Sequence, residues 1–128
     1  MREVLKRKDV MKTGLRGIKE YTDYNWHGKV ISIKYMLPRN EVYELIQNVY
    51  QMCLSSSGDF TPEFVGFALR ANIVSAYALV ELPEDIEELY TLLYYSDLFN
   101  VVLNNACKSQ LDDIVGYFDA WKVVGRVE

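Results

Sequence analysis

Residues 18–37 are rich in aromatic and β-branched residues, and from Ile31 to Leu37 every second residue is apolar, which is the period of a β-strand with one buried face. The stretch Asn25-Trp26-His27-Gly28 supplies turn residues where two such strands would reverse direction. We therefore expect a β-hairpin over about 18–37, which Pro38 ends. The side chains expected on one face of its second strand are Ile31, Ile33, Tyr35 and Leu37.

After Pro38 the apolar spacing changes to the three-to-four residue period of amphipathic helices. Asn40 is the expected N-cap of the first helix, which runs to about Leu54. Thr61-Pro62-Glu63 predicts the start of a second helix, and this helix reaches about Leu79. Because the second helix is apolar nearly all round, it is expected to be the central one. The stripe of the first helix consists of Val42, Leu45, Ile46, Val49 and Cys53.

Shorter helices are expected in the last third of the chain. Pro83, Glu84 and Asp85 would open one of them, with Ile86, Leu89, Leu93 and Tyr90 facing inward. Ser96 or Asp97 would cap the next, and Ser109 to Asp112 matches a capping box that would begin the last.

These elements predict an α+β fold that is mainly α. Residues 1–17 read as a basic N-terminal arm, because Gly14 and Gly17 interrupt any long helix there. Residues 18–128 form a single globular domain, in which the hairpin precedes a four- to five-helix bundle over about 40–124.

Composition excludes several classes of protein. Of the 128 residues, 50% are hydrophobic and 25% are charged, which is typical of a globular domain and not of a disordered chain. The charged start of the chain lacks the apolar segment of a signal peptide. The most apolar stretch, residues 64–80, is interrupted by Arg70, Asn72 and Ser75, so no membrane span is expected. We therefore expect a soluble protein in a reducing, cytoplasmic setting.

Charge is distributed unevenly along the chain. Residues 1–39 hold ten basic and four acidic residues, whereas residues 40–128 hold four basic and fourteen acidic ones. The net charge of −4 therefore combines a basic head with an acidic body. This asymmetry fits a solvated surface, an acidic protein partner that includes a second copy of the chain, or nucleic acid bound through residues 1–39.

Residues that could perform catalysis or bind a metal are few. The single histidine, His27, lies in the predicted turn without a nucleophile beside it, so we expect an exposed or capping role. Cys53 is expected in the core, whereas Cys107, near a helix end, is expected to be more exposed. The acid clusters at 84–88 and 112–113 are expected in the first turns of helices, where the helix dipole favours them. No catalytic residue, metal site or cofactor is predicted, and the chain is not expected to be an enzyme.

Contact with other proteins is the better-supported interpretation. Arg70 lies in the most apolar segment, where it either pairs with an acid of the 84–88 cluster, extends its head to the surface, or crosses a subunit interface. Ten tyrosines modestly favour a protein-binding surface. The candidate interface residues are Lys6, Arg7, Lys8, Trp26, Arg70, Tyr94 and Tyr95.

Three segments carry a resemblance to a known group of proteins. They are Trp26-x-Gly28 with the strand after it, the run from Arg70 to Tyr77 followed by Leu82 to Tyr90, and the tail from Asn104 to Leu111. Over about residues 20–118 the chain resembles small proteins of tailed bacteriophages that infect Gram-positive bacteria. The resemblance implies a virion component or assembly factor, and it identifies no functional residue.

Together these observations predict a non-catalytic phage structural or assembly protein that acts through protein–protein contacts and forms homo-oligomers. Its partners would be further copies of itself or other virion proteins. One alternative is a phage-encoded inhibitor that binds a host defence protein, with the acidic body mimicking nucleic acid. The other is a nucleic-acid-binding module that uses the basic head.

Overall fold

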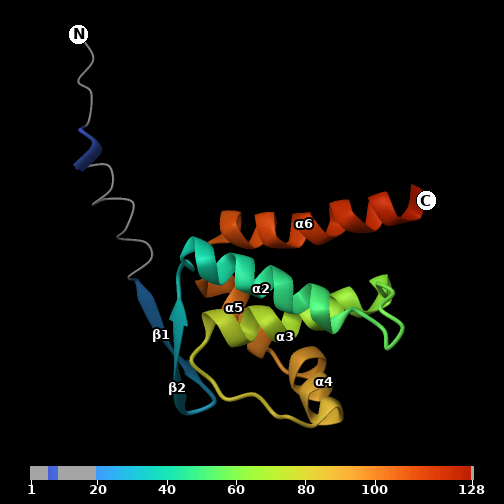
Figure 1. Ribbon diagram of the computed structural model, residues 1–128. Helices are drawn as coiled ribbons and strands as arrows, with labels where there is room; N and C mark the ends of the chain where they lie inside the picture. Colours follow the sequence, from blue (N-terminus) through green and yellow to red (C-terminus); the bar gives the residue numbers. More distant parts are fainter. Residues whose placement is uncertain (1–5, 9–19, 128) are drawn as a thin grey trace.

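The computed structural model describes residues 6–8 and 20–127, and the surroundings of side chains up to Asp119 (Figure 1). Within these residues a two-stranded antiparallel sheet is followed by five α-helices and one short 3-10 helix. The fold is therefore α+β and mainly α, as the sequence predicts. Most of the predicted arm, residues 1–17, lies outside the described part of the chain.

The hairpin consists of β1 (Tyr21–Trp26) and β2 (Lys29–Lys34), paired so that Trp26 lies opposite Lys29. The two turn residues both have a positive φ, 52° at His27 and 84° at Gly28. Such a pair defines a type I′ turn, whose twist matches that of the flanking strands. The Gly28 N–H donates to Asn25 Oδ1 at 3.0 Å, so the predicted turn is confirmed.

The inward face of β2 is shorter than predicted. Ile31, Ile33 and Leu37 are buried, but Tyr35 is 39% exposed, so its predicted place on the buried face is wrong. The strand ends at Lys34, and the alternation of the two faces ends with it. The backbone of Tyr35 serves other partners: its N–H donates to the Glu20 carbonyl and its carbonyl accepts from the Cys107 N–H.

The first long helix, α2 (Arg39–Met52), begins before the predicted cap. The N-cap is Pro38, whose carbonyl accepts hydrogen bonds from the N–H groups of Glu41 and Val42. The prediction of Asn40 as N-cap is therefore wrong, because Asn40 already lies inside the helix. The predicted stripe is confirmed: Leu45, Val49 and Cys53 are buried, and Val42 and Ile46 pack against them.

The central helix is divided into η2 (Pro62–Phe64) and α3 (Val65–Tyr77), and it ends before the predicted Leu79. Its end is set by the sheet: Ala78 forms an antiparallel bridge with Ile33, and the Leu79 N–H donates to the Ser32 carbonyl. The prediction of a central, nearly all-apolar helix is confirmed by its buried residues, Val65, Phe67, Ala68, Leu69, Ala71, Ile73, Val74 and Tyr77.

The last three helices are α4 (Ile86–Tyr95), α5 (Leu98–Asn105) and α6 (Lys108–Val127). Leu93 is buried as predicted, but Ile86 is 59% exposed and Tyr90 is also exposed, so their predicted inward positions are wrong. The prediction of a capping box at Ser109 is also wrong, because α6 begins before Ser109 and its first turn contains no acid. Asp112 and Asp113 accordingly lie beyond that turn.

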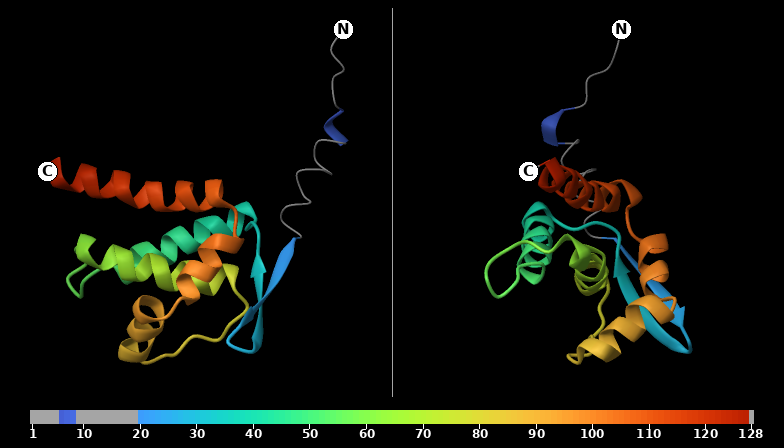
Figure 2. Two further views of the ribbon diagram at one scale, coloured as in Figure 1. Left: turned by 180° about the vertical axis from the view of Figure 1, so that it is seen from behind. Right: turned by 90° about the vertical axis from the view of Figure 1, so that its right-hand side faces the viewer.

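In space, α2, α3 and α6 run roughly alongside one another, and the hairpin crosses one end of this group (Figure 1). The view along the helices in Figure 2 places α6 and α4 on opposite sides of α3. An extended connection between α3 and α4 leads away from the hairpin, so that α4 lies at the edge of the molecule. One face of α4 is therefore left uncovered by the described residues.

Candidate protein-interaction site

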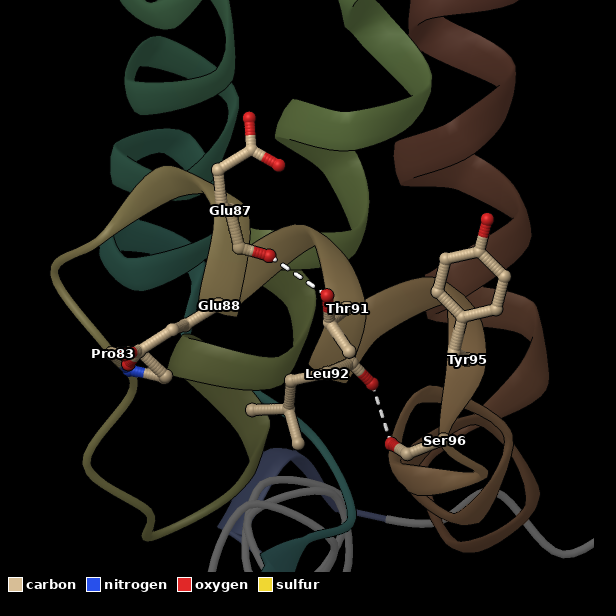
Figure 3. Close-up of a pocket in the computed structure, with 7 residues that line it drawn as sticks. All are labelled: Pro83, Glu87, Glu88, Thr91, Leu92, Tyr95 and Ser96. Carbon is tan, nitrogen blue, oxygen red and sulfur yellow. Dashed lines mark hydrogen bonds between the residues drawn. The ribbon is translucent and has the colours of Figure 1, made fainter.

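The uncovered face of α4 carries a shallow cleft of about 500 Å³ (Figure 3). Its residues recur at three- and four-residue spacings, so they share one side of the helix. Pro83, in the connection before the helix, closes one end. The lining consists of Pro83, Glu87, Glu88, Thr91, Leu92, Tyr95 and Ser96, and we call this surface the α4 cleft.

The exposed surface of the α4 cleft is mainly apolar. Tyr95 is 79% exposed, and Leu92 beside it is half-buried. The two aliphatic hydroxyls in the cleft bond to the backbone of the helix itself: Thr91 Oγ1 donates to the Glu87 carbonyl at 2.9 Å, and Ser96 Oγ donates to the Leu92 carbonyl. The centre of the cleft therefore offers mainly apolar and aromatic contact area, which is characteristic of the core of a protein-binding surface.

Acidic residues surround the N-terminal end of this cleft. Asp85 is the N-cap of α4 and its carboxylate accepts a hydrogen bond from the Glu87 N–H at 2.8 Å. Glu87 and Glu88 occupy the first turn, where the helix dipole favours negative charge, as predicted. Within the described residues, none of the acids from 84 to 88 forms an ion pair. Their combined negative charge therefore faces solvent.

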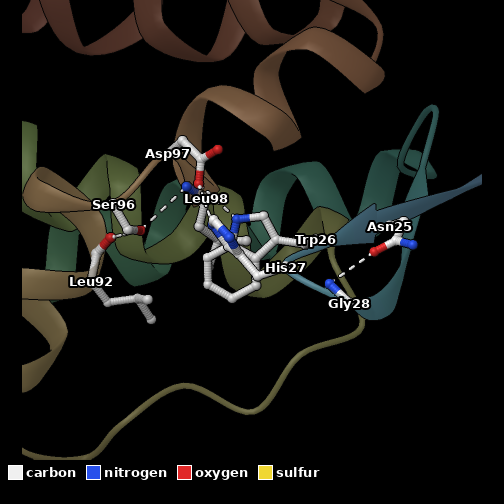
Figure 4. Close-up of polar contacts among 8 residues, drawn as sticks. All are labelled: Asn25, Trp26, His27, Gly28, Leu92, Ser96, Asp97 and Leu98. Carbon is white, nitrogen blue, oxygen red and sulfur yellow. Dashed lines mark hydrogen bonds and ion pairs between the residues drawn. The ribbon is translucent and has the colours of Figure 1, made fainter.

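The hairpin tip is joined to the C-terminal end of α4 through Asp97 (Figure 4). Trp26 Nε1 donates to Asp97 Oδ1 at 2.7 Å, and His27 Nε2 lies 3.5 Å from the same oxygen. The Trp26 hydrogen bond, with a smaller contribution from His27, lowers the pKa of Asp97 below its ordinary value. Asp97 thereby holds the hairpin tip next to Ser96, at the edge of the α4 cleft.

An adjoining side of α4 carries a second group of aromatic residues. The Tyr90 and Tyr94 rings are stacked, with their centroids 4.4 Å apart. The guanidinium carbon of Arg70 lies over the Tyr94 ring at 4.4 Å and over the Phe99 ring at 4.6 Å. Of the alternatives for Arg70, pairing with an acid of the 84–88 cluster is wrong, because the described residues show these ring contacts instead. Of the neighbouring residues Tyr94 and Tyr95, only Tyr95 lines the α4 cleft, and its ring contacts Tyr90 edge-on with the centroids 6.1 Å apart.

The structure separates the predicted interface residues. It brings Arg70 and Tyr94 together, places Tyr95 in the α4 cleft, and uses Trp26 to fix the hairpin tip. Lys6, Arg7 and Lys8 are exposed, and the residues that join them to the hairpin lie outside the described part of the chain.

Sequence reasoning missed Leu92 as a cleft residue and Asp97 as the partner of Trp26. Leu92 carries no sequence signal, because an apolar residue on a helix is ordinarily assigned to the core. The sequence indicates Asp97 only as a possible helix cap, because Trp26 is 71 positions away and no local pattern links the two residues.

The residues considered for catalysis or metal binding are dispersed. Within residues 6–8 and 20–119, no three His, Cys, Asp or Glu side chains are grouped as a metal site would require. His27 is exposed in its turn and Cys53 is buried, both as predicted. Cys107 is only 7% exposed, so its predicted exposure is wrong.

Two further findings bear on the class of protein. No helix in the described part of the chain is both long enough and apolar enough to cross a membrane. Comparison with protein-family models, curated proteins and solved structures finds no match to this chain. The functional interpretation therefore depends on the site itself.

Proposed function

We propose that this is a non-catalytic assembly protein that associates with further copies of itself through the α4 cleft. The carrying observation is an exposed aromatic and apolar surface, centred on Tyr95 and bordered by acids without cationic partners among the described residues. Aromatic residues in the centre of a surface with polar groups around it are typical of protein interfaces. The phage setting, as a structural or assembly protein of the virion, is part of the proposal and rests on the sequence resemblance.

Charge supports a second copy as the partner. The acidic residues from 84 to 88 border the cleft, and Lys6, Arg7 and Lys8 form an exposed basic segment of the same chain. Complementary charges of this kind steer association and fix its orientation. The basic segment of one copy would therefore lie against the acidic end of the α4 cleft of another.

Light scattering behind size exclusion tests this proposal on the full chain. At about 50 mM salt we expect a mass above the 14.9 kDa of one chain, and at about 500 mM a shift toward that value, because salt screens exposed charges. Replacing Lys6, Arg7 and Lys8 with Glu should produce the monomer at low salt. The charge-conserving control, Lys6→Arg with Arg7→Lys and Lys8→Arg, should retain the larger mass.

The contribution of the cleft is tested by a pair of tyrosine variants. Tyr95→Ala should weaken association by about tenfold or more, the effect of removing a central interface tyrosine. Tyr117→Ala removes a tyrosine that is also exposed but lies on α6, and it should leave association unchanged. A natural chain that is monomeric at low salt would overturn self-association and favour the binding of a different protein. A 260/280 nm absorbance ratio typical of bound nucleic acid would favour the nucleic-acid-binding alternative.

A further inference from the structure

A separate groove of about 550 Å³ lies between α3, α5 and α6. Its inner surface includes the buried side chains of Leu69, Ile73 and Leu111, and half-buried Phe99, Leu103 and Val115 line it as well. Its size lies within the range of small-molecule sites, about 300–1,000 Å³. The groove is therefore large enough for an apolar chain of moderate length.

Arg70 lies in this groove with its orientation fixed by two rings. Its guanidinium carbon lies over Tyr94 from α4 and over Phe99 from α5. A guanidinium packed on ring faces keeps its N–H donors in its own plane, where they suit the two oxygens of a carboxylate. In the described part of the chain, none of these donors has a protein acceptor or an anionic partner.

Positive charge is scarce after residue 39, yet two of the basic side chains lie at the groove. Residues 40–128 contain only four basic side chains, and two of them, Arg70 and Lys108, line the groove. Asp112 is the one acidic lining residue. The acidic surface elsewhere would repel an anion, so these two cations mark the groove as the place where one could bind.

We propose that the groove binds a small amphipathic carboxylate, such as a fatty acid. The apolar chain would lie along Leu69, Ile73 and Leu111, and the carboxylate would accept hydrogen bonds from Arg70. This site is independent of the self-association proposed above, because Arg70 is not a lining residue of the α4 cleft. A protein helix is a poorer fit, since a stable protein interface needs about 1,200 Å² or more of buried surface.

Calorimetric titration of the full chain with dodecanoate, kept below its micelle concentration, tests the proposal. We expect saturable binding of one molecule per chain, with the largest backbone amide shifts in α3, α5 and the first half of α6. Arg70→Met should weaken binding by about tenfold or more, the loss of a charge-assisted contact. Arg39→Met is the matched control, because the Arg39 guanidinium also lies over a tyrosine ring, that of Tyr43, but outside the groove.

Thermal unfolding of each variant establishes that it is folded. Lys108→Met, at the exposed second cation of the groove, should also weaken the binding of dodecanoate. Dodecyltrimethylammonium, with the same chain and the opposite charge, should not bind. Equal binding of that cation would overturn the proposal, as would equal losses of affinity in Arg70→Met and Arg39→Met. Amide shifts centred on the α4 cleft instead of the groove would also overturn it. Failure to bind dodecanoate while an acidic apolar peptide binds would also overturn it.

Discussion

At the scale of single residues, Asp97 shows how one carboxylate fixes the position of a hairpin. It accepts from Trp26 Nε1, although the two residues are 71 positions apart. The hydrogen bond favours the ionised carboxylate, and the pKa of Asp97 is therefore lowered. Because the pKa is lowered, the hydrogen bond between Trp26 and Asp97 contributes fully to stability above the ordinary aspartate range. This contribution is lost as the pH falls through the pKa of the folded state.

Trp26 fluorescence should report this titration. In a Trp121→Phe background, we expect the emission to change with a midpoint below the ordinary aspartate pKa, because the pKa of Asp97 is lowered. Asp97→Asn can still accept the indole hydrogen bond but cannot titrate, so the change should disappear. Far-UV circular dichroism over the same titration separates this local event from unfolding. A transition that persists in Asp97→Asn would assign the titration to another group.

The two cysteines differ through their surroundings. The Ser109 hydroxyl and the Gln110 backbone N–H lower the pKa of the Cys107 thiol, whereas burial raises the pKa of Cys53. Since the thiolate is the reactive form, iodoacetamide at about pH 7.5 should modify Cys107 several-fold faster than Cys53. Peptide mass spectrometry measures both rates.

Ser109→Ala should slow the labelling of Cys107 by raising its pKa, and Ser56→Ala in an exposed loop should not. If Cys53 reacted as fast as Cys107, local opening of the core rather than thiolate formation would control the reaction.

At the scale of elements, Gln110 attaches α6 to the rest of the fold. Its Oε1 accepts from the Leu37 N–H at 2.8 Å and from the Tyr77 hydroxyl, and its Nε2 donates to the Leu37 carbonyl at 3.0 Å. One side chain thus joins α6, α3 and the segment between β2 and α2. Burial of Tyr77 raises the pKa of its hydroxyl, which keeps that group a proton donor over the physiological range.

Removing the Gln110 side chain should lower the free energy of unfolding. Gln110→Ala leaves the Leu37 backbone groups and the Tyr77 hydroxyl without their partner, so we expect a loss of about 2–3 kcal/mol in the free energy of unfolding. Gln47→Ala, on the exposed surface of α2, should change stability by less than about 0.5 kcal/mol. Urea denaturation gives both values. An effect of Gln110→Ala no larger than the control would mean that water replaces the three hydrogen bonds.

At the scale of the whole molecule, the sequence combines a basic head with an acidic body, and the acids of α4 border an apolar cleft. If these charges meet between copies, exchanging their signs should restore association. Glu84, Glu87 and Glu88 changed to Lys should dissociate the oligomer, as should Lys6, Arg7 and Lys8 changed to Glu. The six changes together have the natural net charge of −4 and should recover the larger mass.

Light scattering at low salt measures this recovery. Circular dichroism checks that the lysines at 87 and 88 in the first turn of α4, and the lysine at 84 before its N-cap, leave the helix folded, because they oppose its dipole. If the variant with all six substitutions remained monomeric, the two charged segments would not be in contact between copies.

Much of the fold follows from local sequence patterns. The hairpin turn, the α2 stripe and the apolar central helix were all predictable, because alternation, helical spacing and positive-φ turn residues act over a few neighbouring positions. Element ends were harder: α3 stops at Tyr77 because Ala78 pairs with Ile33, a contact between distant segments. The exposure of Tyr35 was also not predictable, because its carbonyl accepts a hydrogen bond from the distant Cys107 N–H.

By itself, then, the sequence determined the class of fold, the order of its elements and the uneven charge. Only the tertiary structure decided which face of α4 stays uncovered, and it alone placed Asp97 beside Trp26 and Arg70 between Tyr94 and Phe99. The physical reason is that these features depend on how helices pack against one another. Side-chain pairing across large sequence separations leaves no periodic trace in the chain.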